Sequence, residues 1–145
     1  MKDKQAKLYY EVGNNFLKQK HWLSAISSYK DAIRFNPKYF KAYCNLGVCY
    51  KNSGLYREAE ESFKKALKLK PYSAVVYNNL GNVYSNMNQL EEAKKFYLQA
   101  LRIYPKYINA QYNLGQAYYF SGEHEKATES RIVLEQIKSK RAVLR

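Results

Sequence analysis

The chain has 145 residues, and its 25 Lys or Arg against 12 Asp or Glu give a formal net charge of +13. With 46% apolar and 16% aromatic residues it can bury enough surface for one domain, which excludes a disordered chain. It has no run of about 18 apolar residues and no apolar stretch near Met1, so we expect no membrane span, no signal peptide and a cytoplasmic location. The high positive charge is compatible with an acidic partner.

The chain repeats itself at an interval of 34 residues, and this repeat organises everything else. Three sets of residues keep the interval: Gly13, Gly47, Gly81 and Gly115; Ala25, Ala59, Ala93 and Ala127; Pro37, Pro71 and Pro105. Around the glycines and alanines, apolar and aromatic residues recur three and four positions apart, the spacing of an amphipathic helix. Each repeat is therefore predicted to be a pair of helices.

The recurring residue types explain how the two helices would pack. Gly and Ala carry little side chain, which lets the helices approach closely, and the aromatic residues fill the wider gaps. Each proline ends a second helix, since it lacks the amide donor of the helical hydrogen bond. Gly54 and Gly122 lie in the turns between helices, where a left-handed residue is useful. In chain order, the repeats are predicted over residues 6–39, 40–73, 74–107 and 108–145.

The fourth repeat departs from the pattern. It has Gln111 where an aromatic residue is expected, Arg131 where Tyr or Phe is expected, and Ser139 in place of proline. Without that proline, a helix that starts near Glu123 can continue to about Val143. Because the end of a stacked repeat array needs a polar outer face, we interpret this helix as a cap.

This frame resembles the tetratricopeptide repeat, with its W-x2-L-G-x2-Y, A-x3-F and P pattern over 34 residues. It is carried by Tyr43, Leu46, Gly47 and Tyr50 in the second repeat and by the residues one interval later in the third, with Tyr in place of Trp. The resemblance implies an all-α fold, a right-handed α-solenoid of antiparallel helix pairs in a single domain over residues 1–145. It also implies a groove lined mainly by first helices and a non-enzymatic role in binding other proteins.

Residues for catalysis or metal binding are sparse. His21 and His124 both precede a second helix, and no Ser or Cys lies at a spacing that would make a nucleophilic pair. Cys44 and Cys49 are five residues apart on one predicted helix, so they point to different sides and cannot form a disulfide. We therefore expect no enzymatic activity, no cofactor and no metal site.

Asparagine is distributed unevenly between the two helices of each repeat. Ten of the twelve asparagines fall in predicted first helices: Asn14, Asn15, Asn45, Asn52, Asn78, Asn79, Asn82, Asn86, Asn109 and Asn113. Asn is a mediocre helix former, so helix propensity does not explain the bias. Asn45, Asn79 and Asn113 stand two residues before successive glycines and form the sharpest subset. A side-chain amide both donates and accepts, which matches the peptide group of an extended ligand.

The candidate peptide-binding site consists of this ladder with Asn14, Asn78 and Asn82, and with Lys7 and Lys41 to attract acidic flanks. Asparagine ladders grip peptide backbones in related superhelices of protein glycosyltransferases and peroxisomal import receptors. Related clamp-type domains instead bind a C-terminal carboxylate through Lys and Arg. Here Asn14 and Asn45 match that clamp, but its cationic positions hold Tyr10, Val75 and Asn79. Backbone and side-chain recognition is therefore favoured over capture of a chain terminus.

Three alternatives stay open at this point. The ladder amides could bond only to neighbouring helices and hold the stack together. The basic second helices could bind nucleic acid, although the related RNA-reading repeats use 35 residues and not 34. The chain could also self-associate or belong to a longer array, with Val143 and Leu144 at the start of a seam.

Overall fold

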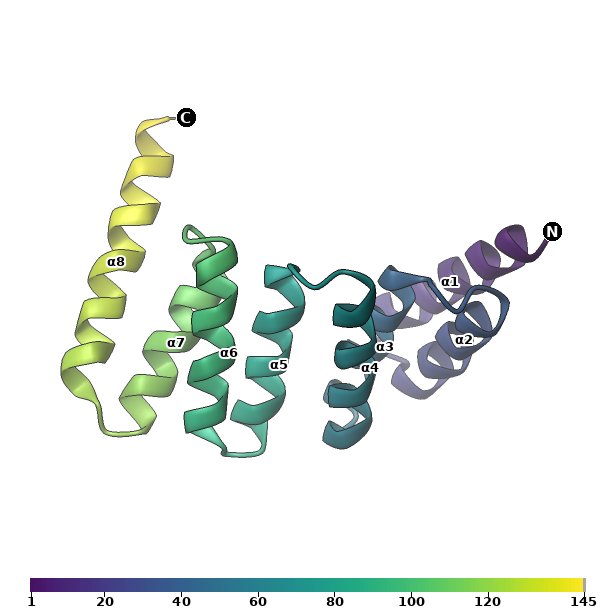
Figure 1. Ribbon diagram of the computed structural model, residues 1–145, viewed down its shortest axis with the longest axis horizontal. Helices are drawn as coiled ribbons and strands as arrows, with labels where there is room; N and C mark the ends of the chain where they lie inside the picture. Colours follow the sequence, from purple (N-terminus) through teal and green to yellow (C-terminus); the bar gives the residue numbers. More distant parts are fainter. Residues whose placement is uncertain (145) are drawn as a thin grey trace. The chain divides into compact units, whose positions relative to one another are not determined.

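The computed structural model describes residues 1–144, and over this range the regular secondary structure consists of eight α-helices (Figure 1). Cα packing divides the chain into two compact units, Met1–Pro71 (unit 1) and Tyr72–Arg145 (unit 2), and each contains four helices. Arg145, the last residue of the predicted fourth repeat, lies outside the described residues. The single domain expected over residues 1–145 stays a prediction.

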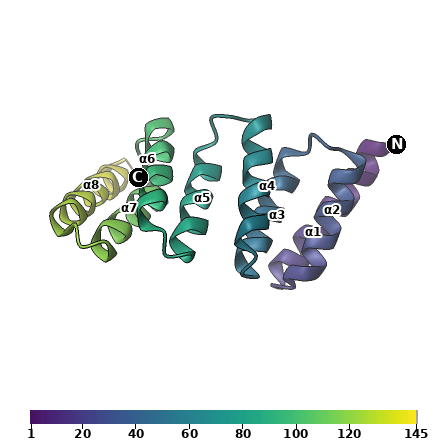
Figure 2. The same cartoon turned by 60° about the horizontal axis from the view of Figure 1, so that its bottom comes forward.

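Unit 1 contains the first two helix pairs. Its helices are α1 (Lys2–Lys18), α2 (Trp22–Phe35), α3 (Phe40–Asn52) and α4 (Tyr56–Leu69). Helices α1 and α2 pack as an antiparallel pair, as do α3 and α4, and α2 also packs against α3 (Figures 1 and 2). Helix α1 begins four residues before the predicted start of the first repeat at residue 6.

Unit 2 contains the third and fourth pairs. Its helices are α5 (Ala74–Asn86), α6 (Leu90–Ile103), α7 (Ile108–Phe120) and α8 (His124–Val143). Helix α7 packs against α8, α6 and, more lightly, α5, so it fills a groove between the two helices that precede it. Helix α8 is 20 residues long, whereas α6 has 14, because no proline stops α8 at residue 139.

The turns within the helix pairs need a left-handed backbone. Gly54 and Gly122 adopt φ values of +78° and +85°. The equivalent positions in the first and third repeats hold Lys20 and Asn88, which take the same conformation with φ near 59° and 58°. The turn geometry is thus preserved at all four places although only two of the residues are glycines, and Asn tolerates this region better than most residues.

Close helix contacts in the first three repeats depend on glycine. A Cβ atom built on Gly13 would lie 2.6 Å from the ring of Tyr29, one on Gly47 would lie 2.6 Å from the ring of Phe63, and one on Gly81 would lie 2.4 Å from the ring of Tyr97. The aromatic ring of each second helix therefore lies directly on the glycine of the first helix.

The fourth repeat lacks this contact. A Cβ on Gly115 would meet only the Cβ of Ser130 at 3.3 Å and a backbone oxygen at 3.9 Å. Arg131 stands where Tyr29, Phe63 and Tyr97 stand in the other repeats, and its side chain is exposed. The space above Gly115 is therefore not filled by a ring.

Candidate functional site

A network of amides and a hydroxyl joins three helices of unit 2. The Oδ1 atom of Asn82 on α5 accepts a hydrogen bond from the hydroxyl of Tyr97 on α6 at 2.7 Å and from Nδ2 of Asn113 on α7 at 3.1 Å. Nδ2 of Asn113 also donates to Oδ1 of Asn78 at 3.0 Å. Burial raises the pKa of Tyr97 to about 12, so its hydroxyl stays protonated and can donate. We call these four residues the unit 2 network.

Unit 1 contains the same arrangement two repeat intervals earlier. Oδ1 of Asn14 on α1 accepts from the hydroxyl of Tyr29 on α2 at 2.7 Å and from Nδ2 of Asn45 on α3 at 3.1 Å. Nδ2 of Asn45 also donates to the hydroxyl of Tyr10 at 3.3 Å. The pattern therefore needs three residues in register: an Asn, a Tyr 15 positions later and an Asn 31 positions later.

These bonds bear directly on the asparagine ladder. The N–H groups of Asn45 and Asn113 bond to neighbouring helices, as the stack-holding alternative expects, and this orients each amide. Both N–H groups of Asn113 are used within unit 2, so its Oδ1 is the atom left to accept a hydrogen bond from a ligand. The structure thus gives these two amides a positioning role inside the fold and leaves an acceptor on each.

Asn79 differs from the other two ladder residues. It is half-buried, and no hydrogen bond among the residues described for unit 2 uses its side chain. Asn79 therefore has both its side-chain donor and its side-chain acceptor available to a ligand.

A groove of about 550 Å³ brings the predicted unit 2 residues together. Eleven residues line it: Val75, Asn78, Asn79, Asn82, Tyr107, Ile108, Asn109, Tyr112, Asn113, Leu134 and Lys138. Most come from α5 and α7, which contain no charged residue at all. The groove is therefore lined mainly by amides and by aromatic or aliphatic side chains, with one cation.

That cation, Lys138 on α8, is a site residue that the sequence analysis missed. It follows Leu134 by one helical turn, and Leu134 is buried, so both face α7. Its ammonium group lies 3.8 Å from the carboxylate of Glu135 and its side chain is 51% exposed. Its position four residues after Leu134 could have indicated that Lys138 lies on the same face of α8. That inference also requires knowing that Leu134 packs in the core, which only the structure shows.

Lys7 and Lys41 lie elsewhere. Lys7 is exposed on α1 and Lys41 is exposed on α3, both in unit 1. Neither takes part in an ion pair among residues 1–144. Their role in attracting acidic segments stays a prediction.

A buried lysine ties α6 to the turn between α7 and α8. The side chain of Lys94 is 6% exposed, and its Nζ lies 2.6 Å from a carboxylate oxygen of Glu91 and 3.2 Å from the hydroxyl of Ser121. It also pairs with Glu123, which bonds to Lys126 at 2.8 Å. Burial by itself would lower the pKa of Lys94, but its bonds to Glu123 and Glu91 outweigh burial and raise it. The ammonium group is therefore charged and serves to fasten the last turn of unit 2.

This ion cluster predicts a loss of stability in acid. Hydrogen bonds from Lys126 and Lys94 lower the pKa of Glu123 from 4.5 to about 2. A carboxylate whose folded pKa is depressed stabilises the fold above its unfolded pKa, and this contribution disappears as the pH falls from about 4.5 toward 2. Glu123→Gln is therefore expected to lower the melting temperature at pH 7 by a few degrees and to flatten the decline between pH 5 and 2. Melting curves followed by circular dichroism at several pH values measure both effects.

Glu129→Gln serves as the matched control, because Glu129 is an exposed carboxylate on the same helix α8. If the two variants show the same pH dependence, the ion cluster does not account for the acid sensitivity.

Cysteine and histidine show no catalytic grouping in the described part of the chain. Burial raises the pKa of Cys44 to about 11 and that of Cys49 to about 12, so both are neutral thiols at pH 7. His21 packs near the ring of Phe16, and His124 contacts the ring of Tyr119 edge-on at 5.3 Å. Within residues 1–144 no group of three or more His, Cys, Asp or Glu is placed to hold a metal ion. Over the same range no helix has the length and hydropathy to cross a membrane.

Comparison with solved structures supports the helix-pair architecture. Two structures of MamA align over 94% of this chain, one at 23% identity with a TM-score of 0.88 over 80% of its length, the other at 29% with a TM-score of 0.82 over 74%. The first TPR domain of Spaghetti (RPAP3), solved with the HSP90 peptide SRMEEVD, aligns over 83% of this chain and 95% of its own at 24% identity, with a TM-score of 0.78. A comparison with curated protein sequences gives no significant match.

Comparison with protein families gives the assignment. The profile described as Tetratricopeptide repeat matches residues 38–106 and 72–130, and a second one described as TPR repeat matches residues 13–54. Together these matches cover most of the chain and agree with the four helix pairs and with the glycine contacts of the first three. The chain therefore belongs to the tetratricopeptide repeat family, a family of protein-interaction modules.

Proposed function

We propose that this protein is a non-enzymatic adaptor or scaffold that binds an extended peptide segment of another protein in the unit 2 groove. The observation that carries the proposal is the orientation of the groove amides. The unit 2 network fixes Asn113 with its Oδ1 available, and Asn79 beside it has a complete amide available. An extended peptide exposes alternating N–H and C=O groups, which such amides complement.

The walls of the groove fit side chains of the peptide. Tyr107, Tyr112 and Ile108 offer apolar surface in the same groove as the amides. Aromatic residues bind with little loss of conformational entropy, since they have only two rotatable side-chain bonds. Peptide side chains with apolar or aromatic character are therefore expected next to the backbone that the asparagines bind.

Lys138 adds a preference for an acidic residue. Among residues 1–144 it is the single charged side chain that lines the groove, and it is 51% exposed although its ammonium group lies 3.8 Å from Glu135. A carboxylate of the ligand would gain a charge-assisted hydrogen bond there. The peptide complex of the RPAP3 domain supports peptide binding by this fold in general. The cationic clamp positions are occupied here by Tyr10, Val75 and Asn79, which supports recognition of an internal segment.

Binding of selected peptides tests the proposal. We expect a library of 12-residue peptides, panned against the purified protein, to yield ligands whose affinity falls about tenfold in Asn79→Ala. Two lost hydrogen bonds at about 0.5–1.5 kcal/mol each correspond to roughly this factor. Asn79 makes no hydrogen bond within unit 2, so its replacement is expected to change affinity with an unchanged melting temperature. Fluorescence anisotropy with labelled peptides gives the dissociation constants.

Asn86→Ala is the matched control, because Asn86 is an exposed amide on the same helix α5 outside the groove. Equal effects of Asn79→Ala and Asn86→Ala, or no effect of Asn79→Ala on any selected peptide, would contradict the proposed site. Lys138→Ala separates the acidic preference, since it is expected to weaken acidic ligands and to leave neutral ones unchanged.

A further inference from the structure

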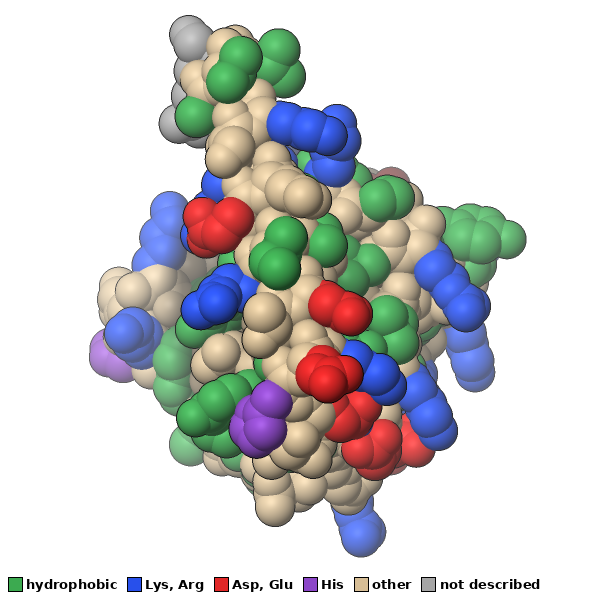
Figure 3. All heavy atoms as spheres, turned by 90° about the vertical axis from the view of Figure 1, so that its left-hand side faces the viewer, with side chains coloured by type: hydrophobic (Ala, Val, Ile, Leu, Met, Phe, Trp, Pro, Cys, Tyr) green, Lys and Arg blue, Asp and Glu red, His purple; other side chains and the backbone are tan. Residues whose placement is uncertain are grey.

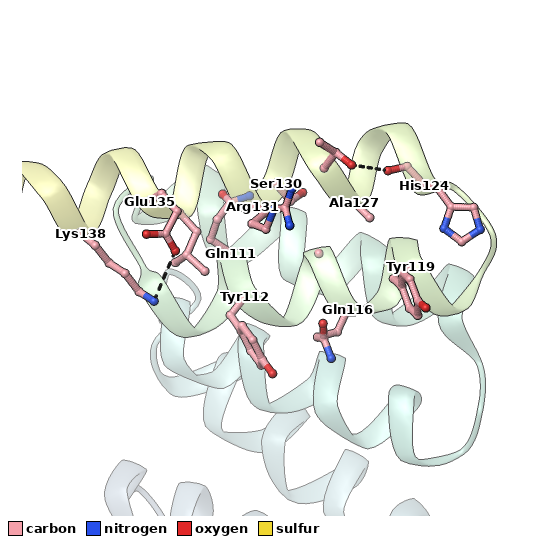
Figure 4. A pocket seen from close by; sticks show the side chains of 13 residues that line it. Gln111, Tyr112, Gln116, Tyr119, His124, Ala127, Ser130, Arg131, Glu135 and Lys138 are labelled. Atoms are coloured by element: carbon pink, nitrogen blue, oxygen red, sulfur yellow. Dashed lines mark hydrogen bonds and ion pairs between the residues drawn. The ribbon is translucent and has the colours of Figure 1, made fainter.

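A second groove of about 530 Å³ lies between α7 and α8 and adjoins the first groove, with which it shares Tyr112, Leu134 and Lys138. Gln111, Gln116 and Tyr119 line its α7 side, and Ala127 and Arg131 line its α8 side. Figure 4 shows Gln111, Ala127 and Arg131 between the two helices and Gln116 at the edge of α7 that is turned away from α8. Figure 3, which looks onto the α8 side of unit 2, shows apolar patches interrupted by basic and acidic groups. We call this surface the end groove.

Comparison with the preceding repeat indicates what kind of element the end groove can bind. One interval earlier, the corresponding groove between α5 and α6 is filled by α7. Ala110, Leu114 and Ala117 of α7 are 0%, 4% and 2% exposed, and Leu114 and Ala117 share a core cluster with Ala93 and Tyr97 of α6. The end groove repeats this receiving surface, with Ala127 in place of Ala93. It is therefore shaped to receive the first helix of another repeat.

The described chain does not fill the end groove itself. After α6, the chain turns at Pro105 and returns as α7, which begins at Ile108. Helix α8 continues without interruption through the corresponding positions and ends at Val143. Because α8 does not turn back at that point, no helix of residues 1–144 lies in the groove.

Helix α1 carries the matching surface. Three repeat intervals before Ala110 and Leu114 stand Leu8 and Val12, which are 58% and 36% exposed. In α7 the same two positions are buried in the groove between α5 and α6. The first helix of this chain therefore presents, without a partner in unit 1, the apolar positions that a first helix uses for docking.

The polar residues at the centre of the contact are complementary as well. Within unit 2, Asn113 of the incoming helix donates to Asn82, which also accepts from Tyr97. At the corresponding positions the end groove has Gln116 and Arg131, and α1 has Glu11. A carboxylate accepts hydrogen bonds, and Arg donates them from its planar guanidinium group. Glu11, Gln116 and Arg131 can therefore form hydrogen bonds where Asn113, Asn82 and Tyr97 form theirs, and Glu11 with Arg131 would also be an ion pair.

We propose that the protein associates head to tail, with α1 of a second copy docked in the end groove and Glu11 bonded to Arg131. The two surfaces lie on different units, so each copy can bind one neighbour through each of them. The weight-average mass is expected to rise with protein concentration at a salt concentration that screens the repulsion between two copies of net charge +13. Sedimentation equilibrium measures this directly.

Charge reversal tests the pairing. Glu11→Arg and Arg131→Glu are each expected to weaken association at least tenfold, because like charges then face each other, and the double variant is expected to restore it. A mixture of the two single variants gives the sharpest result. In the mixture both contacts between the two variants are complementary, because the end groove of Glu11→Arg meets the intact α1 of Arg131→Glu, and the reversed pair of the double variant forms at the other contact. The mixture is therefore expected to associate in alternating order as the wild type does, whereas each single variant alone is not.

Arg57→Glu and Glu58→Lys are the matched controls, since both residues are exposed on α4 and belong neither to α1 nor to the lining of the end groove. Circular dichroism verifies that each variant folds. A wild-type protein that stays monomeric at millimolar concentration would overturn the proposal. So would single variants that associate as the wild type does, or a double variant that fails to recover while folding normally.

Discussion

Replacing Gly81 by Ala is expected to destabilise unit 2 by about 2–3 kcal/mol. The new Cβ would lie 2.4 Å from Cε1 and 2.5 Å from Cδ1 of Tyr97, far inside van der Waals contact. Tyr97 is only 2% exposed and its hydroxyl is bonded to Asn82, so the ring cannot move aside without breaking the unit 2 network. Urea denaturation followed by circular dichroism measures the change in the free energy of unfolding.

Gly115→Ala is the matched control for this experiment. It makes the same change at the equivalent position of α7, where the nearest heavy atom to the new Cβ is 3.3 Å away. Ala exceeds Gly in helix propensity by about 1 kcal/mol, which offsets a small adjustment of Ser130. The variant is therefore expected to differ from wild type by no more than about 1 kcal/mol. Equal losses at the two glycines would show that the ring contact does not decide the effect.

Asn82→Val is expected to destabilise the protein by about 2 kcal/mol. The change removes the acceptor that Tyr97 and Asn113 share, and leaves the nearly buried hydroxyl of Tyr97 without that partner. An unsatisfied buried donor costs more than a hydrogen bond contributes on balance, because its desolvation is no longer compensated. The free energy of unfolding again provides the measurement.

The second repeat supplies a compensating variant. It has Val48 and Phe63 at the positions of Asn82 and Tyr97, a pair with no donor to satisfy. Asn82→Val with Tyr97→Phe copies that pair and is expected to recover about 1 kcal/mol relative to the single change. Asn86→Val, at an exposed position of the same helix, measures the cost of a β-branched residue in α5 alone. Strictly additive effects of the two changes would contradict the shared hydrogen bond.

The fold could be predicted closely because its information is local and repeated. Helix ends follow from Pro37, Pro71 and Pro105, since proline stops a helix wherever it falls. The long last helix follows from the absence of a proline at Ser139. The left-handed turn at Lys20 could not be inferred from residue type, whereas Asn88 is a residue that tolerates this conformation. Both turns are imposed by packing within each helix pair.

The candidate site could be predicted only in outline. Asn45, Asn79 and Asn113 occupy the same position in successive repeats and look identical in the sequence. Their hydrogen bonds differ because the partner residues stand more than 30 positions away on another helix, as Asn82 and Asn78 do for Asn113. The sequence pattern of a single helix cannot distinguish an amide that bonds to a neighbouring helix from an amide that is available to a ligand.

The sequence by itself determined the helix pairs, their boundaries and the uncharged surface of α5 and α7. These properties depend on the repeat interval, on the positions of glycine and proline, and on which helices contain charged residues, all of which can be seen in the order of residues. Only the tertiary structure decided which atoms of the asparagines are available, that Lys138 joins the groove, and that Arg131 leaves the end groove unfilled. Those properties depend on side chains from three helices meeting at one point. Their distances are set by helix packing and cannot be obtained from the order of residues alone.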